Sequence, residues 1–318
     1  MQFLRSIAFG GLVATALASQ TVLAADTLKL IIPTAPGGGT DGYFRVLAKE
    51  AEPFLKETVV VMNVPGAGGT IGVAQMVRAV PDGQTVAGVW LGPVTVSPNT
   101  MKVPYSPNDY IPVIQVSSAP YVLCVHPEFP ANDGKGLIAE LQKNKDKYAY
   151  GNDGAGGPGQ LATARILRAT NASARDIPFK GAGETLTSFL GKNVDIYVGS
   201  IPPILQYAQL GRAKCLLVTS AERVASLPQA ASLTDLGIAS EETILWRALI
   251  APKGTPPERI AVLESAFERA ANSPAARKFL DDAGEQTAIK KGAALKRYID
   301  TEYEAMAKLA KALNLTPQ

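Results

Sequence analysis

The stretch that decides the fold is Pro33-Thr34-Ala35-Pro36-Gly37-Gly38-Gly39-Thr40-Asp41, which joins two segments of opposite periodicity. The apolar segment 28–32 before it predicts a short strand, and apolar residues after Asp41 recur at helical spacing. A strand that turns through glycines into a helix leaves backbone N–H groups unpaired where the helix dipole adds partial positive charge. The sequence therefore predicts an anion-binding turn at this position.

Two further glycine-rich turns also join a predicted strand to a predicted helix. The β-branched run 58–62 leads through Gly66–Thr70 into a helix, and the strand-like run 148–150 leads through Asn152–Gly159 into another. Such turns lie at the carboxyl edge of a parallel sheet, which is where ligands bind in α/β proteins. Glycine also merely ends strands and caps helices, but three turns at equivalent positions favour a binding site.

Strand-like and helix-like segments alternate from Leu28 onward, and this order predicts a parallel sheet with right-handed crossovers. The same order starts afresh at Tyr121, which predicts a second α/β lobe. Extended runs at 114–118 and 244–249 are expected to connect the two lobes, with a cleft between them.

The chain after the extended run 244–249 is expected to be helical, with no further strand, and to pack back on the first lobe. The predicted helices begin at or near prolines in two cases and span 257–271, 274–283 and 294–313. The predicted boundaries are 1–24 for a signal peptide, 25–116 plus 246–318 for lobe 1, and 117–245 for lobe 2.

The N-terminus has the features of a secretory signal peptide. Arg5 supplies a positive charge, the apolar segment 7–17 is too short to span a bilayer, and small residues precede a cleavage position after Ala24. A membrane anchor is the alternative interpretation. The expected location of the mature chain is the periplasm.

Export would place Cys124 and Cys215 in an oxidising compartment, where a pair of cysteines can form a disulfide. Each residue lies inside a strand-like run, so two buried free thiols are equally compatible with the sequence.

Composition narrows the class of function. The chain has 318 residues, 47% of them hydrophobic, which is enough for two lobes with cores of their own. The formal net charge is only +3 and charges of both signs are interspersed, so we expect no nucleic-acid partner.

The segment 154–159 matches the dinucleotide-binding motif G-x-G-x-x-G, but Pro158 interrupts it. Lys180 also follows the next strand, at the place where an acidic residue would bind ribose. We therefore expect no nucleotide cofactor.

Catalysis has few candidate groups. His126 shares a strand face with Cys124, which could form a nucleophilic pair, but packing within the strand is the favoured interpretation. Ser200 lacks the second glycine of a nucleophile elbow, and no His, Cys and carboxylate residues have metal-ligand spacing. We expect no catalytic residue, no metal and no enzyme.

Several side chains near the turns are candidates for ligand contact. Asp41 would repel an anion, so we expect it to accept hydrogen bonds from backbone donors, whereas Trp90 could wall the pocket or pack in the core. The candidate ligand-binding residues lie in the turns or at neighbouring strand ends and are Thr34, Ala35, Gly37, Gly38, Gly39, Thr40, Asp41, Gly68, Trp90, Asn152, Asp153, Gly154, Ala155, Gly156, Gly157, Lys180 and Ser200.

Five motifs stand in the order and spacing of one known family: Pro33–Asp41, Asn63–Gly72, Pro81–Gly83, Pro178–Gly181 and Trp246–Pro256. The chain resembles the substrate-binding proteins of tripartite tricarboxylate transporters, the TctC-like or Bug receptors. The resemblance implies a two-lobed periplasmic-binding-protein fold of the Venus-flytrap, type II-like kind with two hinge strands. It also implies a receptor that captures a small organic carboxylate and delivers it to a membrane permease. We expect the protein to be a monomer.

The sequence departs from the family pattern at two turns. Gly157 and Gln160 replace the usual serine and histidine of the second-lobe turn, and residues 90–93 read Trp-Leu-Gly-Pro where hydroxyls are usual. These changes favour a flatter or more apolar ligand than citrate, such as an aromatic carboxylate.

A secreted enzyme that uses the same anion site is the alternative function. The effector lobes of a transcription regulator are disfavoured by export and by the lack of a DNA-binding helix pair.

Overall fold

The computed structural model describes residues 27–37, 39–152, 157–179 and 182–312. Within these ranges the chain forms a mixed α/β fold around one curled sheet, in which the path of paired strands is β2-β1-β3-β9-β4-β7-β5-β6. Two more strands, β8 and β10, pair with β4 alone. In the described part of the chain, no helix combines the length and the apolar character needed to cross a membrane.

The N-terminal half of the sheet is parallel, as the alternation of strands and helices predicts. The strand β1 (Thr27–Ile32) pairs in parallel with both β2 (Thr58–Asn63) and β3 (Thr85–Trp90). The crossovers contain α1 (Gly39–Leu55) and α2 (Thr70–Val77). Short helical turns follow β2 and β3 and are Ala67–Gly69, the π-helical Gly92–Val96, and α3 (Ser97–Thr100).

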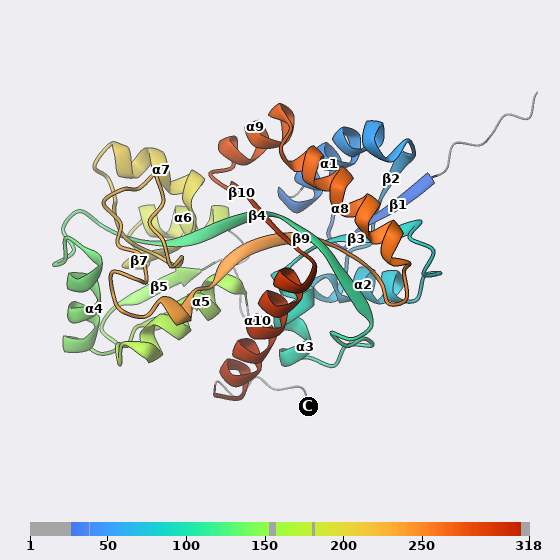
Figure 1. The fold of residues 1–318 in the computed structure, drawn as a ribbon. Coiled ribbons are helices and arrows are strands. Elements are labelled where there is room, and N and C mark those ends of the chain that lie inside the picture. The colour runs from blue at the N-terminus through green and yellow to red at the C-terminus, as the bar shows by residue number, and fades with distance from the viewer. Residues whose placement is uncertain (1–26, 38, 153–156, 180–181, 313–318) are drawn as a thin grey trace, which may run out of the picture.

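Two long strands connect the halves of the molecule. The strand β4 (Tyr110–Val125) pairs antiparallel with β9 (Ile244–Pro252) over its first part and with β7 and β8 over its second. Figure 1 shows both strands crossing from the half that contains α1, α2 and α8 to the half that contains α4 to α7. The predicted extended runs at 114–118 and 244–249 are therefore the middle of β4 and the start of β9.

The second half repeats the parallel arrangement. The strand β5 (Ala149–Asn152) pairs in parallel with β6 (Arg175–Pro178) and with β7 (Ile196–Ser200). The strand β8 (Lys214–Val218) runs antiparallel to β4. The helices of this half are α4 (Gly134–Lys143), α5 (Pro158–Ala169), α6 (Ala182–Leu190) and α7 (Ile201–Gln209), with a short 3-10 turn at Ala239–Glu241.

The C-terminal helices pack on the first half, as predicted. Phe267 of α8 shares a core with Leu30 of β1 and Phe44 of α1, and all three side chains are fully buried. This core excludes water from a large apolar area and so stabilises the association of chain segments that are far apart in sequence. The helices are α8 (Pro257–Ala271), α9 (Pro274–Asp282) and α10 (Gly292–Ala312).

The prediction that no strand follows β9 is wrong. The segment β10 (Gln286–Lys291) pairs antiparallel with β4 near Ser118 and Ile114. The segment reads Gln-Thr-Ala-Ile-Lys-Lys, and most of its residues are half-buried. It lacks the alternation of apolar and polar residues that identifies a strand from sequence.

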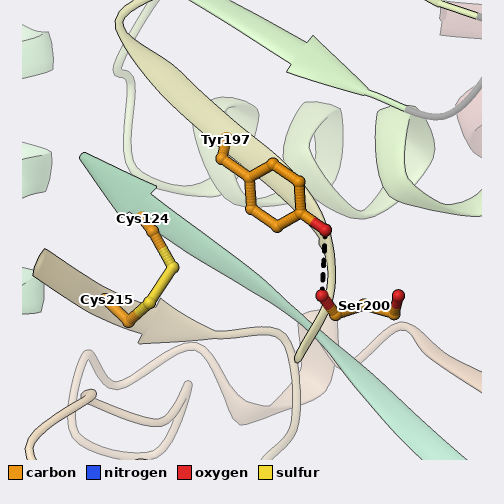
Figure 2. Close-up of a disulfide and its surroundings, with 4 residues drawn as sticks. All are labelled: Cys124, Tyr197, Ser200 and Cys215. Carbon is orange, nitrogen blue, oxygen red and sulfur yellow. Dashed lines mark hydrogen bonds between the residues drawn. A yellow bond between two sulfur atoms is a disulfide. The ribbon is translucent and has the colours of Figure 1, made fainter. Parts of the chain in front are cut away.

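The two cysteines form a disulfide between β4 and β8. Cys124 and Cys215 are directly opposite each other in the register of this antiparallel pair, and Figure 2 shows the bond between them. The alternative of two free thiols is therefore wrong. The bridge links positions that are 91 residues apart and joins β8 to β4 within the second half.

Candidate functional site

The turn between β1 and α1 is organised by the carboxylate of Asp41. Its Oδ2 accepts a hydrogen bond from the Gly37 N–H at 2.9 Å, and its Oδ1 accepts one from Asn63 Nδ2 at 2.8 Å. Arg45 Nε adds an ion pair at 3.0 Å, and Asn63 also donates to the carbonyl of Thr34. Asp41 thus accepts a backbone N–H, in agreement with the prediction, and Asn63 joins the end of β2 to this turn.

The charge state of Asp41 follows from the same contacts. Burial opposes ionisation, but the hydrogen bonds from Arg45, the Gly37 N–H and Asn63 outweigh it and lower the pKa of Asp41 below its usual value. The carboxylate is therefore ionised at neutral pH and holds the turn in one conformation.

The remaining residues of this turn face solvent or lie close to it. Ala35, Gly37 and Gly39 are exposed, and Thr34 and Thr40 are half-buried, whereas Gly38 lies outside the described residues. Because α1 begins at Gly39, the N–H groups of its first turn have no intrahelical carbonyl to bind. These groups and the helix dipole make an accessible donor surface that suits an anion.

Arg247 is a residue of this region that the sequence analysis did not single out. It lies on β9, is almost completely buried, and donates from Nε to Thr40 Oγ1 at 3.0 Å. A substituent at the Cβ position of Gly39 would lie 3.3 Å from Arg247 Nη2, so the guanidinium lies directly behind the start of α1. The two residues are 207 positions apart, and no local pattern in the sequence could have indicated the contact.

The second glycine turn adjoins the first and carries an aromatic wall. Ala67, Gly68 and Gly69 have positive φ angles of 46°, 64° and 93°, and Gly68 is exposed. A Cβ at Gly69 would lie 3.1 Å from the Pro33 carbonyl oxygen and 2.8 Å from the Trp90 ring, which places the three groups in one cluster. Glycine is needed here because both the backbone conformation and the indole exclude a side chain.

Trp90 closes β3 and remains half-buried. A Cβ at Gly92 would lie 2.4 Å from the indole Nε1, so the ring is seated between Gly69 and Gly92. The indole also packs at the edge of the core that contains Trp246 and Leu295. One part of the Trp90 ring therefore packs against the core, and the rest is partly accessible to solvent.

In the second half, the candidate turn follows β5. Asn152 is fully buried, and its Nδ2 donates to Asp176 Oδ1 at 2.5 Å, while Gln160 of α5 donates to the other carboxylate oxygen. Gly157 is half-buried and precedes α5 directly. Asp176 is thus the organising carboxylate of this turn, which the sequence analysis missed. The candidates Asp153, Gly154, Ala155, Gly156 and Lys180 lie outside the described residues.

Ser200 ends β7 at the same edge of the sheet as Asn152, because β5 and β7 are parallel neighbours. Its carbonyl oxygen accepts a hydrogen bond from the Tyr197 hydroxyl at 2.9 Å, as Figure 2 shows. The Tyr197 hydroxyl lies 2.3 Å from the Cβ position of Gly199, so this close approach requires glycine. The contact fixes the backbone at the start of α7.

The candidate residues therefore form two groups. Thr34, Gly37, Gly39, Thr40 and Asp41 share one turn, next to the cluster of Gly68 and Trp90, on the carboxyl edge of the first half. Asn152, Gly157 and Ser200 lie on the carboxyl edge of the second half.

In the part of the chain that the structure describes, the two residues considered as a nucleophilic pair, Cys124 and His126, make structural contacts instead. Cys124 is bonded to Cys215, so it cannot act as a nucleophile with His126. The His126 ring stacks on Phe189 with centroids 4.2 Å apart, and its Nε2 lies 3.2 Å from the Val194 carbonyl. Within the same described ranges, no cluster of three or more His, Cys, Asp and Glu residues is placed to hold a metal ion.

Comparison with known proteins identifies the family. The family model of the tripartite tricarboxylate transporter family receptor, TctC, matches residues 43–315. The chain belongs to this family. The TctC-family chain is 31% identical to the protein BugT of Bordetella pertussis over 251 residues, which cover 78% of this chain and 77% of BugT.

Solved structures show the same fold. A TctC solute-binding protein from Polaromonas is 28% identical, with a TM-score of 0.82 over 90% of this chain and 98% of that one. MatC from Rhodopseudomonas palustris with bound malate is 24% identical, with a TM-score of 0.69 over 89% and 98% of the chains. Rpa4515 from R. palustris with adipate is 23% identical, with a TM-score of 0.73 over 92% and 98%. The TctC-family chain is therefore a solute-binding receptor with the two-lobed, type II-like fold of periplasmic binding proteins.

Proposed function

We propose that this TctC-family receptor captures a small organic carboxylate between its two halves and delivers it to the permease of a tripartite tricarboxylate transporter. The observation that carries the proposal is the β1–α1 turn, where Asp41 fixes the backbone and leaves the start of α1 accessible. The turns after β2 and β5 would supply further donors. Charge-assisted hydrogen bonds contribute about 1.5–3 kcal/mol each, so a few of them give micromolar affinity after ordering costs.

The ligand class follows from the same residues and from related proteins. MatC and Rpa4515 hold malate and adipate, which are small dicarboxylates. Trp90 adds a partly accessible indole beside the second glycine turn of this chain, and such a ring favours a ligand with a flat or apolar body. The proposed ligands are therefore dicarboxylates, tricarboxylates or aromatic carboxylates.

Calorimetry of the mature protein with malate, adipate, citrate and phthalate tests the proposal. We expect at least one of the four to bind with micromolar affinity and to raise the unfolding temperature, since a ligand at a hundred times its Kd adds about 2.7 kcal/mol of stability. Binding by none of them would contradict the proposed ligand class. Turnover of a bound ligand would support the alternative of a secreted enzyme, because we propose binding without catalysis.

A matched pair of variants tests the role of the first turn. Gly39→Pro removes one backbone N–H at the first position of α1, where proline is otherwise well tolerated, and Gly39→Ala keeps that N–H. Both variants place a Cβ 3.3 Å from Arg247 Nη2, so only the N–H distinguishes them, and we expect Gly39→Pro to bind the carboxylate about tenfold more weakly than Gly39→Ala. Equal affinities of the two variants would exclude a backbone donor at this position.

The proposal includes the cellular setting and the moving parts. We propose that the chain is exported, cleaved after Ala24 and monomeric, and that residues 25–116 with 246–318 move as one lobe against 117–245. N-terminal sequencing of the periplasmic fraction and small-angle scattering with and without the bound carboxylate would test these points.

A further inference from the structure

Arg247 connects the first glycine turn to both strands that join the halves. Its side chain is only 4% exposed, and its Nε donates to Thr40 Oγ1 at 3.0 Å. Its Nη1 lies 3.4 Å from Ser117 Oγ on β4, and both terminal nitrogens donate to Glu285. Ser117 and Arg247 are also register partners in the β4–β9 pair. One buried guanidinium thus links α1, β4, β9 and the segment before β10.

This contact restricts the directions in which the Thr40 hydroxyl can donate its proton. A hydroxyl has one proton to donate and two lone pairs, and Arg247 Nε–H occupies a lone pair. Thr40 is the second residue of α1, so no preceding helical turn offers a carbonyl for its proton. Because Thr40 is half-buried at the turn, the proton is available on the side away from Arg247.

We propose that Arg247 is a positioning residue for ligand binding: it holds the Thr40 hydroxyl as a hydrogen-bond donor to the bound carboxylate. This inference rests on the proposed function and deepens it. Glu285 pairs with the guanidinium and neutralises its charge, so the effect of Arg247 is one of orientation and not of long-range attraction. Arg247 acts through Thr40 and does not itself touch the ligand.

Binding measurements on a set of variants test this inference. The probe is whichever of malate, adipate, citrate and phthalate binds the unaltered protein most tightly. The variants are Thr40→Val, Thr40→Ser, the combined Arg247→Met with Glu285→Leu, and the combination of that pair with Thr40→Val. Arg247 and Glu285 are replaced together because removal of one alone would leave a buried charge unpaired.

We expect Thr40→Val to weaken binding by about tenfold or more, and the Arg247/Glu285 double variant to weaken it by a similar factor. The triple variant should bind no more weakly than Thr40→Val, because residues that act through one contact are not additive. Thr40→Ser should retain most of the affinity because it keeps the hydroxyl.

Other outcomes separate the two proposals. Unchanged affinity in the double variant, or losses that multiply in the triple variant, would overturn the positioning role while leaving the proposed function intact. Failure of all four probes to bind the unaltered protein would overturn the proposed function and this inference with it. If the double variant does not fold by circular dichroism, Arg247→Lys replaces it, since lysine keeps the charge opposite Glu285 but has no Nε–H fork to orient Thr40. Full affinity in Arg247→Lys would also overturn the inference.

Discussion

Arg165 of α5 lies 3.5 Å from Glu302 of α10, and both side chains are buried. The guanidinium also bonds to Thr243 Oγ1 and to the carbonyls of Ser240 and Glu242, just before β9. Because α5 follows the candidate turn of the second half and α10 packs on the first half, this pair links the two halves beside the hinge (Figure 1). Arg165 also pairs with Glu241 through its Nε at 3.1 Å, so it keeps a counter-ion when Glu302 is protonated or replaced. Loss of Arg165 would instead leave Glu302 buried without a counter-ion, which is strongly destabilising when the carboxyl is ionised.

Glu302 should make stability depend on pH. Burial raises the pKa of Glu302, and the charge of Arg165 reverses only part of that effect. A carboxyl group whose pKa is raised in the folded state binds more protons there than in the unfolded chain, so it lowers stability as pH rises from about 4.5 through the folded pKa. We expect Glu302→Gln to remove this dependence, so that the variant gains stability relative to the unaltered protein over that window in urea unfolding.

Glu304→Gln is the matched control, because Glu304 lies on the same helix and is exposed. It shows what the loss of one exposed carboxylate from α10 does to stability over the same range of pH. A stability difference for Glu302→Gln that does not change with pH would contradict the burial of an ionisable group at this position.

Asp41 should be required for both stability and binding. Asp41→Asn weakens the hydrogen bonds from the Gly37 N–H and Arg45, so we expect a loss of about 1–2 kcal/mol in the free energy of unfolding and weaker carboxylate binding. The pKa of Asp41 is lowered in the folded state, so its contribution is present above about pH 3.8 and is lost as pH falls through the folded pKa. Urea unfolding between pH 2.5 and 7 and calorimetry at pH 7 measure the two effects. Asp82→Asn is the control, since Asp82 accepts the Gln84 N–H in an exposed turn; equal effects of both variants would contradict a special role for Asp41.

The disulfide should contribute substantially to stability. Joining Cys124 to Cys215 closes a long loop, and in the chain-entropy model such a bridge stabilises the fold by about 2–5 kcal/mol. We expect the double variant Cys124→Ala and Cys215→Ala to lose that amount in urea unfolding. Reductant should lower the stability of the unaltered protein toward that of the variant and leave the variant unchanged, and an equal response of both proteins would argue against the bridge.

The local parts of the fold could be predicted from sequence, and the long-range contacts could not. The turn 33–41 carries its own signals, namely an apolar strand, glycines and a helical repeat within a short stretch. The contacts of Thr40 with Arg247 and of Arg165 with Glu302 join residues 207 and 137 positions apart, and each looks like an ordinary charged or polar residue in sequence. Asp176 was missed for the same reason, since only the pairing of β5 with β6 brings it to Asn152.

Trp90 should report ligand binding by its fluorescence. The chain has two tryptophans; Trp246 is fully buried in the hinge strand β9, whereas Trp90 is half-buried next to the second glycine turn. A carboxylate bound at the proposed site would change the solvent exposure and electric field of the Trp90 indole, so we expect the emission to change on titration with the tightest-binding probe. The change should disappear in Trp90→Phe and persist in Trp246→Phe. A response that persists in Trp90→Phe and disappears in Trp246→Phe would instead report the hinge, and it would remove Trp90 from the proposed binding site.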